Sequence, residues 1–155
     1  MRRGDKEIKD NKVIQEVLEH SAICRLGLVD GDEAYIVPVN YAFKDGLIYI
    51  HSAPHGRKIE ILKKNNKVSF EIEYAEEIIK NDIPCEWTAK YRSVMGKGIV
   101  KIENDPVMKK AGLDLIMRKY GASGELTYND QSVSRIVLLI LEVISVAGKQ
   151  SGDWQ

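Results

Sequence analysis

Residues 51–58, which read HSAPHGRK, combine two histidines, a serine, an arginine and a lysine directly after a strand-like segment. A helix predicted over residues 56–65 would put Arg57 and Lys58 in its first turn, where acidic residues are usual because the helix dipole is positive there. Backbone N–H groups at a helix start attract anions, and Arg57, Lys58 and Ser52 can add a bidentate fork, a point charge and a hydroxyl. The segment therefore predicts a phosphate site. The alternative is a solvated basic helix end.

A second candidate element is the stretch around Pro38 and Asn40. Pro38 cannot donate to a sheet ladder, so the strand there is expected to be an edge, a bulge or a bend. Asn40 then offers a hydrogen-bond donor and an acceptor, which suits one edge of a planar heteroaromatic ligand. The alternative is a kinked edge strand with a surface asparagine.

Nucleophilic catalysis and metal binding find little support in the sequence. His51 and Ser52 are adjacent on a predicted strand, so they point to opposite faces and are badly placed as a base–nucleophile pair. His20, His51 and His55 lack the spacing of metal ligands, and no metal site is expected. Neither the G-x-G-x-x-G nor the P-loop pattern occurs.

Composition sets the class of protein. The chain of 155 residues is expected to form a single domain, residues 1–155, and its 23 basic residues balance its 23 acidic ones, so neither nucleic acid nor a membrane is an expected partner. The most apolar segment, residues 136–144, is too short to span a bilayer. Cys24 and Cys85 form no disulfide framework, which favours a cytoplasmic location.

The elements that would position these residues are mostly strands. Asp10 or Asn11 can cap a short first helix, and Asp105-Pro106 can start a helix that stops near Gly121. Glycines at 96 and 98 suggest a bulge or a close approach. Residues 76–86 read as an irregular excursion. The predicted fold is mainly β with α decoration, a six-stranded antiparallel split barrel, with strands at 22–28, 34–43, 47–53, 67–75, 91–103 and 134–146.

Four segments in this order carry a resemblance to a known family: RRGDKEI at the start, residues 25–62, YRSVMGKGIV at 91–100 and AGKQSGDW at 147–154. Together they resemble the pyridoxamine 5′-phosphate oxidase-like flavoproteins and, within them, the nitroimidazole-resistance (Nim-type) group. The resemblance covers nearly the whole chain.

The resemblance implies an FMN-binding split barrel that works as a homodimer, with the flavin in a cleft between subunits. The FMN phosphate would bind at the start of the predicted helix, strand 38–41 would lie along the flavin ring, and residues 91–95 would complete the pocket or the dimer contact. The cofactor-binding residues implied in this way are Pro38, Val39, Asn40, Tyr41, His51, Ser52, Ala53, Arg57, Lys58 and Ser93.

The expected function is that of an FMN-dependent oxidoreductase that reduces a small electrophile, such as a nitro-aromatic compound, with an external electron donor. His51 would hand a proton to the substrate. Vitamin B6 oxidation is not expected, because the additional substrate-phosphate and C-terminal basic residues of the true oxidases are not matched. The alternatives are a non-catalytic flavin-binding protein and a haem-binding protein, with His51, His55 or His20 as the haem ligand.

Two expectations concern packing. Residues 136–141 are apolar in succession, so both faces of that strand need cover, from a packed helix or from a partner subunit. The resemblance favours a partner, and hence a homodimer. Trp154 is expected to dock on the body or the partner, since Gly148 and Gly152 allow a tight path and a free tail rarely carries so much apolar area.

Overall fold

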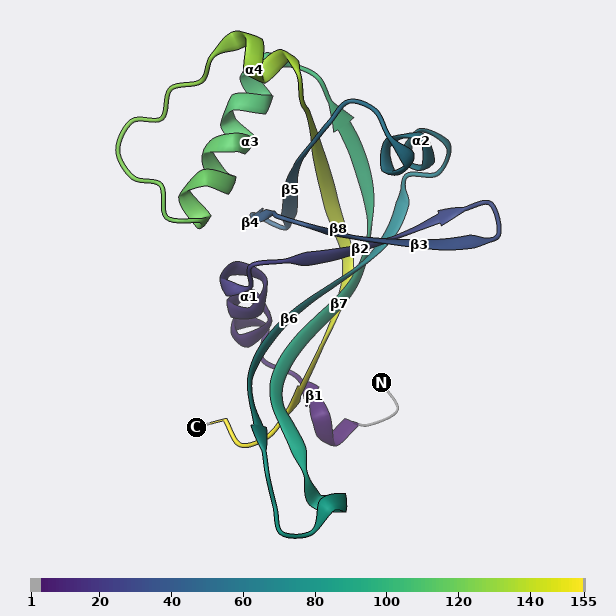
Figure 1. The fold of residues 1–155 in the computed structure, drawn as a ribbon, viewed down its shortest axis with the longest axis vertical. Coiled ribbons are helices and arrows are strands. Elements are labelled where there is room, and N and C mark those ends of the chain that lie inside the picture. Colours follow the sequence, from purple (N-terminus) through teal and green to yellow (C-terminus); the bar gives the residue numbers. More distant parts are fainter. Residues whose placement is uncertain (1–3, 155) are drawn as a thin grey trace.

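The computed structural model describes residues 4–154, without the side chains of residues 75 and 76; Arg2 and Arg3 of the N-terminal motif and Gln155 lie outside this range. The described chain folds as one antiparallel sheet with helices around it (Figure 1). The strands are β1 Glu7–Ile8, β2 Cys24–Asp30, β3 Glu33–Val39, β4 Ala42–Lys44, β5 Leu47–Ser52, β6 Lys67–Ile79, β7 Thr88–Glu103 and β8 Val137–Ser151. The helices are α1 Asn11–His20, α2 Arg57–Lys64, α3 Pro106–Lys119 and α4 Asp130–Ser134, with 3-10 turns at Gly4–Lys6 and Pro84–Glu86.

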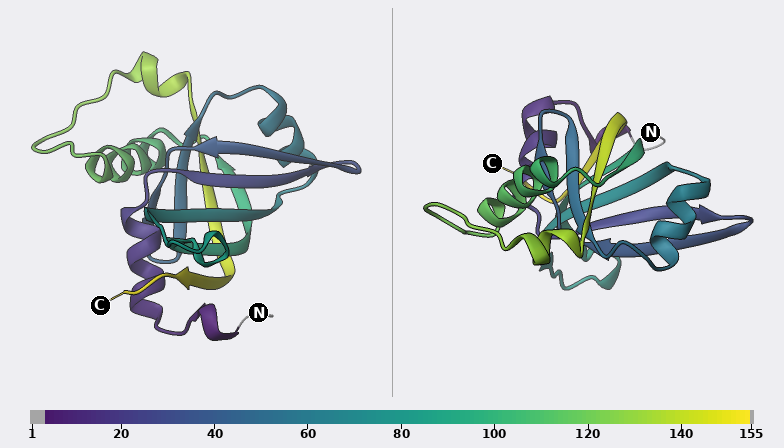
Figure 2. Two further views of the ribbon diagram at one scale, coloured as in Figure 1. Left: turned by 60° about the horizontal axis from the view of Figure 1, so that its bottom comes forward. Right: turned by 90° about the horizontal axis from the view of Figure 1, so that it is seen from above.

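The sheet confirms the predicted fold class, but its described part has eight strands rather than six. The strand order is β3-β2-β6-β7-β8-β5-β4, and β1 pairs with β8. The count differs because β1 is too short to give a sequence pattern and because residues 34–43 divide into β3 and β4. Helices α3 and α4 lie on one side of the barrel and α2 on the other (Figure 2).

The division between β3 and β4 follows Pro38. Pro38 is the last residue but one of β3, an edge strand, where its missing N–H is tolerated. The chain then bends at Asn40 and Tyr41 before β4 begins. The next turn is a tight hairpin, in which Asp45 (φ 52°) and Gly46 (φ 78°) adopt the left-handed conformations that two-residue hairpins require.

Strands β6 and β7 extend past the body as a two-stranded arm (Figure 1). The predicted irregular segment 76–86 is therefore partly strand, and β7 begins at Thr88 instead of residue 91. Ile78, Ile83 and Trp87 are exposed on this arm. A ribbon without a buried face lacks the alternation that identifies strands in a sequence, which explains the error.

The pairing of β7 with its neighbours β6 and β8 depends on glycine, as predicted. The pairing shifts register between Lys97 and Gly98. A Cβ at Gly98 would run into the Glu142 carbonyl and the Leu141 side chain, and a Cβ at Gly96 would run into the Phe70 ring. Both positions therefore admit close approach that a side chain would prevent.

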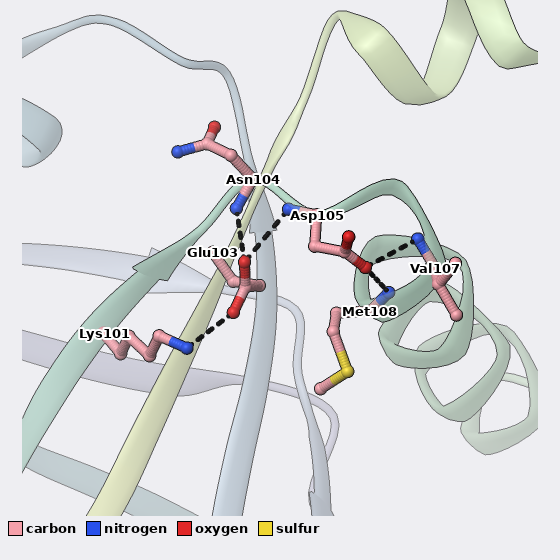
Figure 3. A network of polar contacts seen from close by, with 6 residues as sticks. All are labelled: Lys101, Glu103, Asn104, Asp105, Val107 and Met108. Atoms are coloured by element: carbon pink, nitrogen blue, oxygen red, sulfur yellow. Dashed lines mark hydrogen bonds and ion pairs between the residues drawn. The ribbon is translucent and has the colours of Figure 1, made fainter.

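Helix α3 begins at a well-formed cap, drawn in Figure 3. The Asp105 carboxylate accepts hydrogen bonds from the N–H groups of Val107 and Met108, both at 3.0 Å, and Pro106 occupies the first helical position. The preceding Glu103 accepts from the N–H groups of Asn104 (2.9 Å) and Asp105 (3.0 Å). The predicted start at Asp105-Pro106 is confirmed.

Both faces of the first part of β8, residues 137–141, are covered from within the chain. Leu139 and Leu141 join the barrel core, whereas Leu138 packs against Ile116 and Ala42 under α3. The helix approaches β8 closely because Gly112 leaves room for the Leu138 side chain. Of the two covers expected, a packed helix or a partner subunit, the structure shows the helix: α3 folds back over this part of β8.

The C-terminal segment is ordered against the body, as predicted. The Trp154 ring lies 6.3 Å from the Tyr74 ring and 4.1 Å from the Arg92 guanidinium carbon. The Trp154 indole N–H donates to the Ser151 carbonyl at 2.9 Å, and Gly152 turns the chain with φ 81°.

No helix in residues 4–154 is long and apolar enough to cross a membrane.

Candidate functional site

A pocket of about 380 Å³ opens where β5 ends and α2 begins. It brings together half of the predicted cofactor-binding residues, because β5 delivers two of them and the following turn and helix start deliver the rest. Those residues are His51, Ser52, Ala53, Arg57 and Lys58; Tyr35, Val37, His55 and Gly56 complete the lining.

The helix start at this pocket has no side-chain cap. Gly56 occupies the N-cap position with φ 109°, and its carbonyl accepts from the N–H groups of Ile59 (2.9 Å) and Glu60 (3.1 Å). Few residues other than glycine adopt this φ. A Cβ here would meet no atom within 4 Å, so the backbone conformation, rather than lack of space, requires glycine. Ile59 and Glu60 therefore use their N–H groups within the helix, and the N–H groups of Arg57 and Lys58 are the ones placed to bind an anion.

The two cations of the first turn have different environments. The Arg57 Nε donates to Asp30 Oδ2 at 3.1 Å, and a terminal nitrogen donates to Glu33 Oε2 at 2.8 Å. The same guanidinium lies 4.9 Å from the centre of the Tyr35 ring. These contacts with Glu33 and Asp30 raise the pKa of Arg57. Arg57 is therefore a paired cation, held toward the β2–β3 hairpin.

Lys58 is half-buried and, within residues 4–154, has no carboxylate within ion-pair distance. Desolvation lowers its pKa. Partial desolvation, and next the positive charge of Lys58, lower the pKa of the exposed His51 as well. The Ser52 side chain, buried beside them, lines the same pocket. A pocket with a hydroxyl, an uncapped helix start and a lysine that has no carboxylate partner in residues 4–154 fits a phosphate monoester such as that of FMN.

The residues predicted to lie along the flavin ring do not line this pocket. Tyr41 is fully buried, and its hydroxyl donates to the Leu18 carbonyl at 2.7 Å, while Val39 belongs to the core. Pro38 and Asn40 are exposed. Val37 lines the pocket but was not predicted to do so; the alternation of strand side chains, counted back from Val39, would have indicated it.

Ser93 lies elsewhere, on β7, where it pairs with Glu73 on one side and Lys149 on the other. Next to it, the outer face of the sheet carries a hollow of about 650 Å³ whose apolar lining includes Ile36, Met95 and Val146. Ile36 is 66% exposed and Met95 46% exposed. Within one chain, therefore, the structure separates Ser93 from the α2 pocket.

The three histidines do not converge. His51 and His55 line the α2 pocket, whereas His20 lines a separate cavity beside Arg92 and Trp154. Within the described part of the chain, no three His, Cys, Asp or Glu side chains are grouped as metal ligands would be.

Solved structures share this fold over most of their length. A candidate 5-nitroimidazole antibiotic resistance protein from Bacteroides thetaiotaomicron is 28% identical with a TM-score of 0.82, and the match covers 92% of this chain and 85% of that one. The FAD and haem binding protein from Mycobacterium smegmatis is 16% identical with a TM-score of 0.86, covering 96% and 75%. A FAD-binding protein from Mesorhizobium loti is 19% identical with a TM-score of 0.71, covering 95% and 98%.

Sequence comparison gives the family. An uncharacterized protein of Rhizobium meliloti is 38% identical over 58 residues, a segment that spans 37% of this chain and 38% of that relative. The model of the family described as pyridoxamine 5′-phosphate oxidase matches residues 10–150, which is nearly the whole chain. The chain therefore belongs to the pyridoxamine 5′-phosphate oxidase family.

Proposed function

We propose that this protein is an FMN-binding flavoprotein, an oxidoreductase that reduces a small electrophile such as a nitro-aromatic compound with electrons from an external donor. The observation that carries the proposal is Lys58, a half-buried ammonium without a carboxylate partner in residues 4–154, at the uncapped start of α2. A phosphate there would supply the missing negative charge.

Each part of the pocket has a role in this proposal. Lys58, the first-turn N–H groups and the Ser52 hydroxyl bind the phosphate, and Arg57 approaches it from the side of the β2–β3 hairpin. A bound flavin would supply the electron transfer. His51, which is exposed and lines the pocket, donates a proton to the substrate. Its lowered pKa leaves it mostly neutral at pH 7, so the minority imidazolium is the proton donor.

A homodimer is part of the proposal. The outer sheet face exposes apolar side chains, and a second hollow of about 400 Å³, lined in part by Val29, Ile99 and Ile144, shares lining residues with the hollow near Met95. A contiguous apolar patch of this kind favours a protein contact. A second copy seated on it would bring the region around Ser93 into an interface, which supports a flavin site shared by two subunits.

The relatives support a flavin as the cofactor. The structure from Bacteroides thetaiotaomicron is described as a candidate 5-nitroimidazole antibiotic resistance protein, which supports a nitro compound as substrate. The family's name is not a reason to propose vitamin B6 oxidation here.

The free cysteines, one buried and one exposed, favour a cytoplasmic location.

The alternative is a non-catalytic flavin- or haem-binding protein. Two similar structures are described as a FAD and haem binding protein and as a flavocytochrome from Azotobacter vinelandii. His51 and His55 both line the α2 pocket, and either could ligate a haem iron.

Absorbance and stopped-flow kinetics test these functions. We expect the purified protein to show flavin absorbance, reduction by NADH or NADPH, and reoxidation by a nitro-aromatic compound in repeated turnovers. Flavin absorbance without turnover with any donor would favour the binding protein. A Soret band without flavin would favour the haem protein and contradict the FMN proposal.

A further inference from the structure

The β2–β3 hairpin presents two carboxylates to the helix start that forms the pocket. Asp30 and Glu33 are cross-strand partners at the end of the hairpin, so their side chains lie close together. Both reach Arg57, at 3.1 Å and 2.8 Å, although Arg57 lies on a different element. Asp32, in the turn between the same strands, forms neither a hydrogen bond nor an ion pair with Arg57. The hairpin therefore holds the Arg57 guanidinium with two of its three acidic residues.

This arrangement has an electrostatic consequence for the pocket. The carboxylates of Asp30 and Glu33 carry two negative charges against the one positive charge of Arg57, so these three side chains together are net negative. They lie next to the positive Lys58 side chain, which lines the same pocket as Arg57. The guanidinium has five N–H donors, and Asp30 and Glu33 occupy two of them. Arg57 thus keeps donors that can reach a ligand, but its charge is already neutralised.

We propose that Asp30 and Glu33 are an internal competitor for the ligand phosphate: a phosphate at the α2 start must share Arg57 with these carboxylates or displace them. The proposal rests on the proposed function, because it concerns the regulation of affinity at the same site. Lys58 and the helix N–H groups attract the phosphate, while the carboxylates oppose it by repulsion and by holding Arg57.

The competition implies selectivity. A free inorganic phosphate has only the pocket contacts to set against the two carboxylates, whereas a flavin phosphate is also supported by contacts of the flavin ring. Asp30 and Glu33 therefore weaken the binding of both ligands. The flavin phosphate still binds, because the contacts of its ring add to its affinity, whereas inorganic phosphate has no such contacts. Because the ion pairs of Arg57 are solvent-exposed, the effect should be moderate and should shrink as salt is added.

The test is titration of the full-length protein with FMN and riboflavin at low ionic strength, followed by flavin fluorescence. In the double variant Asp30→Asn/Glu33→Gln we expect FMN to bind about tenfold more tightly and riboflavin to bind as in wild type. We also expect inorganic phosphate to compete with FMN at lower concentrations than in wild type. Unchanged or weaker FMN binding in the double variant would overturn the proposal.

Two controls separate this competition from a general change in charge. Asp32→Asn removes one negative charge from the same hairpin, and we expect a smaller gain in FMN affinity than Asp30→Asn gives. In an Arg57→Met background, the gain from Asp30→Asn should fall to the level of Asp32→Asn. Equal gains from Asp30→Asn and Asp32→Asn would mean that only net charge matters and would contradict the proposal.

A wild-type protein that binds no flavin would contradict the proposed function without deciding this inference. Inorganic phosphate then serves as the probe, with thermal stabilisation as the readout. We expect phosphate to raise the Tm of the Asp30→Asn variant more than that of the Asp32→Asn variant, which carries the same net charge. Equal shifts in Tm would overturn the competition itself.

Discussion

Gly96 and Phe70 are direct cross-strand partners on β7 and β6, and the Phe70 ring fills the space that a side chain at position 96 would need. On the other side, the Ser145 carbonyl oxygen of β8 would lie 2.7 Å from a Cβ at position 96. Gly96→Ala should therefore destabilise the protein by about 1–3 kcal/mol, because the ring or the backbone must move. Urea unfolding measures this loss.

Gly27→Ala is the matched control for Gly96→Ala. A Cβ at Gly27 would lie 3.6 Å from the Ser69 carbonyl oxygen, which is an ordinary van der Waals contact. Its effect should stay within about 0.5 kcal/mol. Equal losses in both variants would mean that the Phe70 contact is not the cause.

Lys58 should contribute more than Arg57 to phosphate affinity. Arg57 is shared with Asp30 and Glu33, whereas Lys58 has no carboxylate partner within residues 4–154. Lys58→Met should weaken FMN binding by about one to two decades and leave riboflavin, which lacks the phosphate, nearly unchanged. Arg57→Met should cost less. Lys63→Met, at the other end of α2, is the control, and titration with both flavins measures all three variants.

The proton-donating role proposed for His51 predicts a pH dependence of turnover. Desolvation and the charge of Lys58 lower its pKa, so the imidazolium becomes more populated as the pH falls below neutrality. If proton transfer from His51 limits turnover, the rate of nitro-aromatic reduction should rise as the pH falls and level off below the lowered pKa. His51→Gln should remove this dependence while the flavin absorbance remains. A pH profile that is unchanged in His51→Gln would exclude the role.

The cap of α3 predicts acid sensitivity. Glu103 accepts hydrogen bonds from Lys101 Nζ and from the N–H groups of Asp105 and Asn104 (Figure 3), and these contacts lower its pKa from 4.5 to about 2. A carboxyl whose pKa is lowered in the folded state stabilises the protein above pH 4.5, and this contribution is lost as the pH falls toward 2.

Glu103→Gln should therefore lower the Tm by a few degrees at pH 7, and the difference from wild type should vanish near pH 2. Glu125→Gln, at an exposed position between α3 and α4, should leave the Tm unchanged. If the Tm of Glu103→Gln differed from that of wild type by the same amount at all pH values, ionised Glu103 would not be the source of the stabilisation.

The outer sheet face predicts the effect of a buried charge on assembly. Met95→Glu would put a carboxylate in the apolar hollow and should halve the molar mass measured by light scattering at micromolar concentration. Val107→Glu, on an α3 residue that is 73% exposed, should leave the mass unchanged. A wild-type protein with the mass of one chain would exclude the homodimer.

The local features of the fold were predictable from the sequence. Asp105-Pro106 starts a helix, Asp45-Gly46 makes a tight hairpin, and residues 51–58 form a strand–turn–helix junction, because each depends on neighbours in the chain. The same locality explains why His51, Ser52, Ala53, Arg57 and Lys58 were correctly expected to lie together.

Contacts between distant elements were not predictable in the same way. The pairing of Arg57 with Asp30 and Glu33 depends on how the β2–β3 hairpin lies against α2, and no local pattern specifies that. Tyr41 is likewise buried among distant elements, and its hydroxyl donates to the Leu18 carbonyl in α1. Both placements follow from tertiary packing, which outweighs the local signal.

The pairing of β5 with β8 has a consequence for biosynthesis. His51 and Ser52 are cross-strand partners of Leu138 and Val137. The strand that carries these two pocket residues, β5, therefore has neighbours on both sides only when β8 is in place. Before residues 137–142 leave the ribosome, β4 and β5 are a two-stranded ribbon, which is marginally stable in water. The nascent chain therefore carries the cationic residues of the α2 pocket before it can assemble the pocket, so binding of the cofactor proposed above belongs to a late stage in the synthesis of each chain.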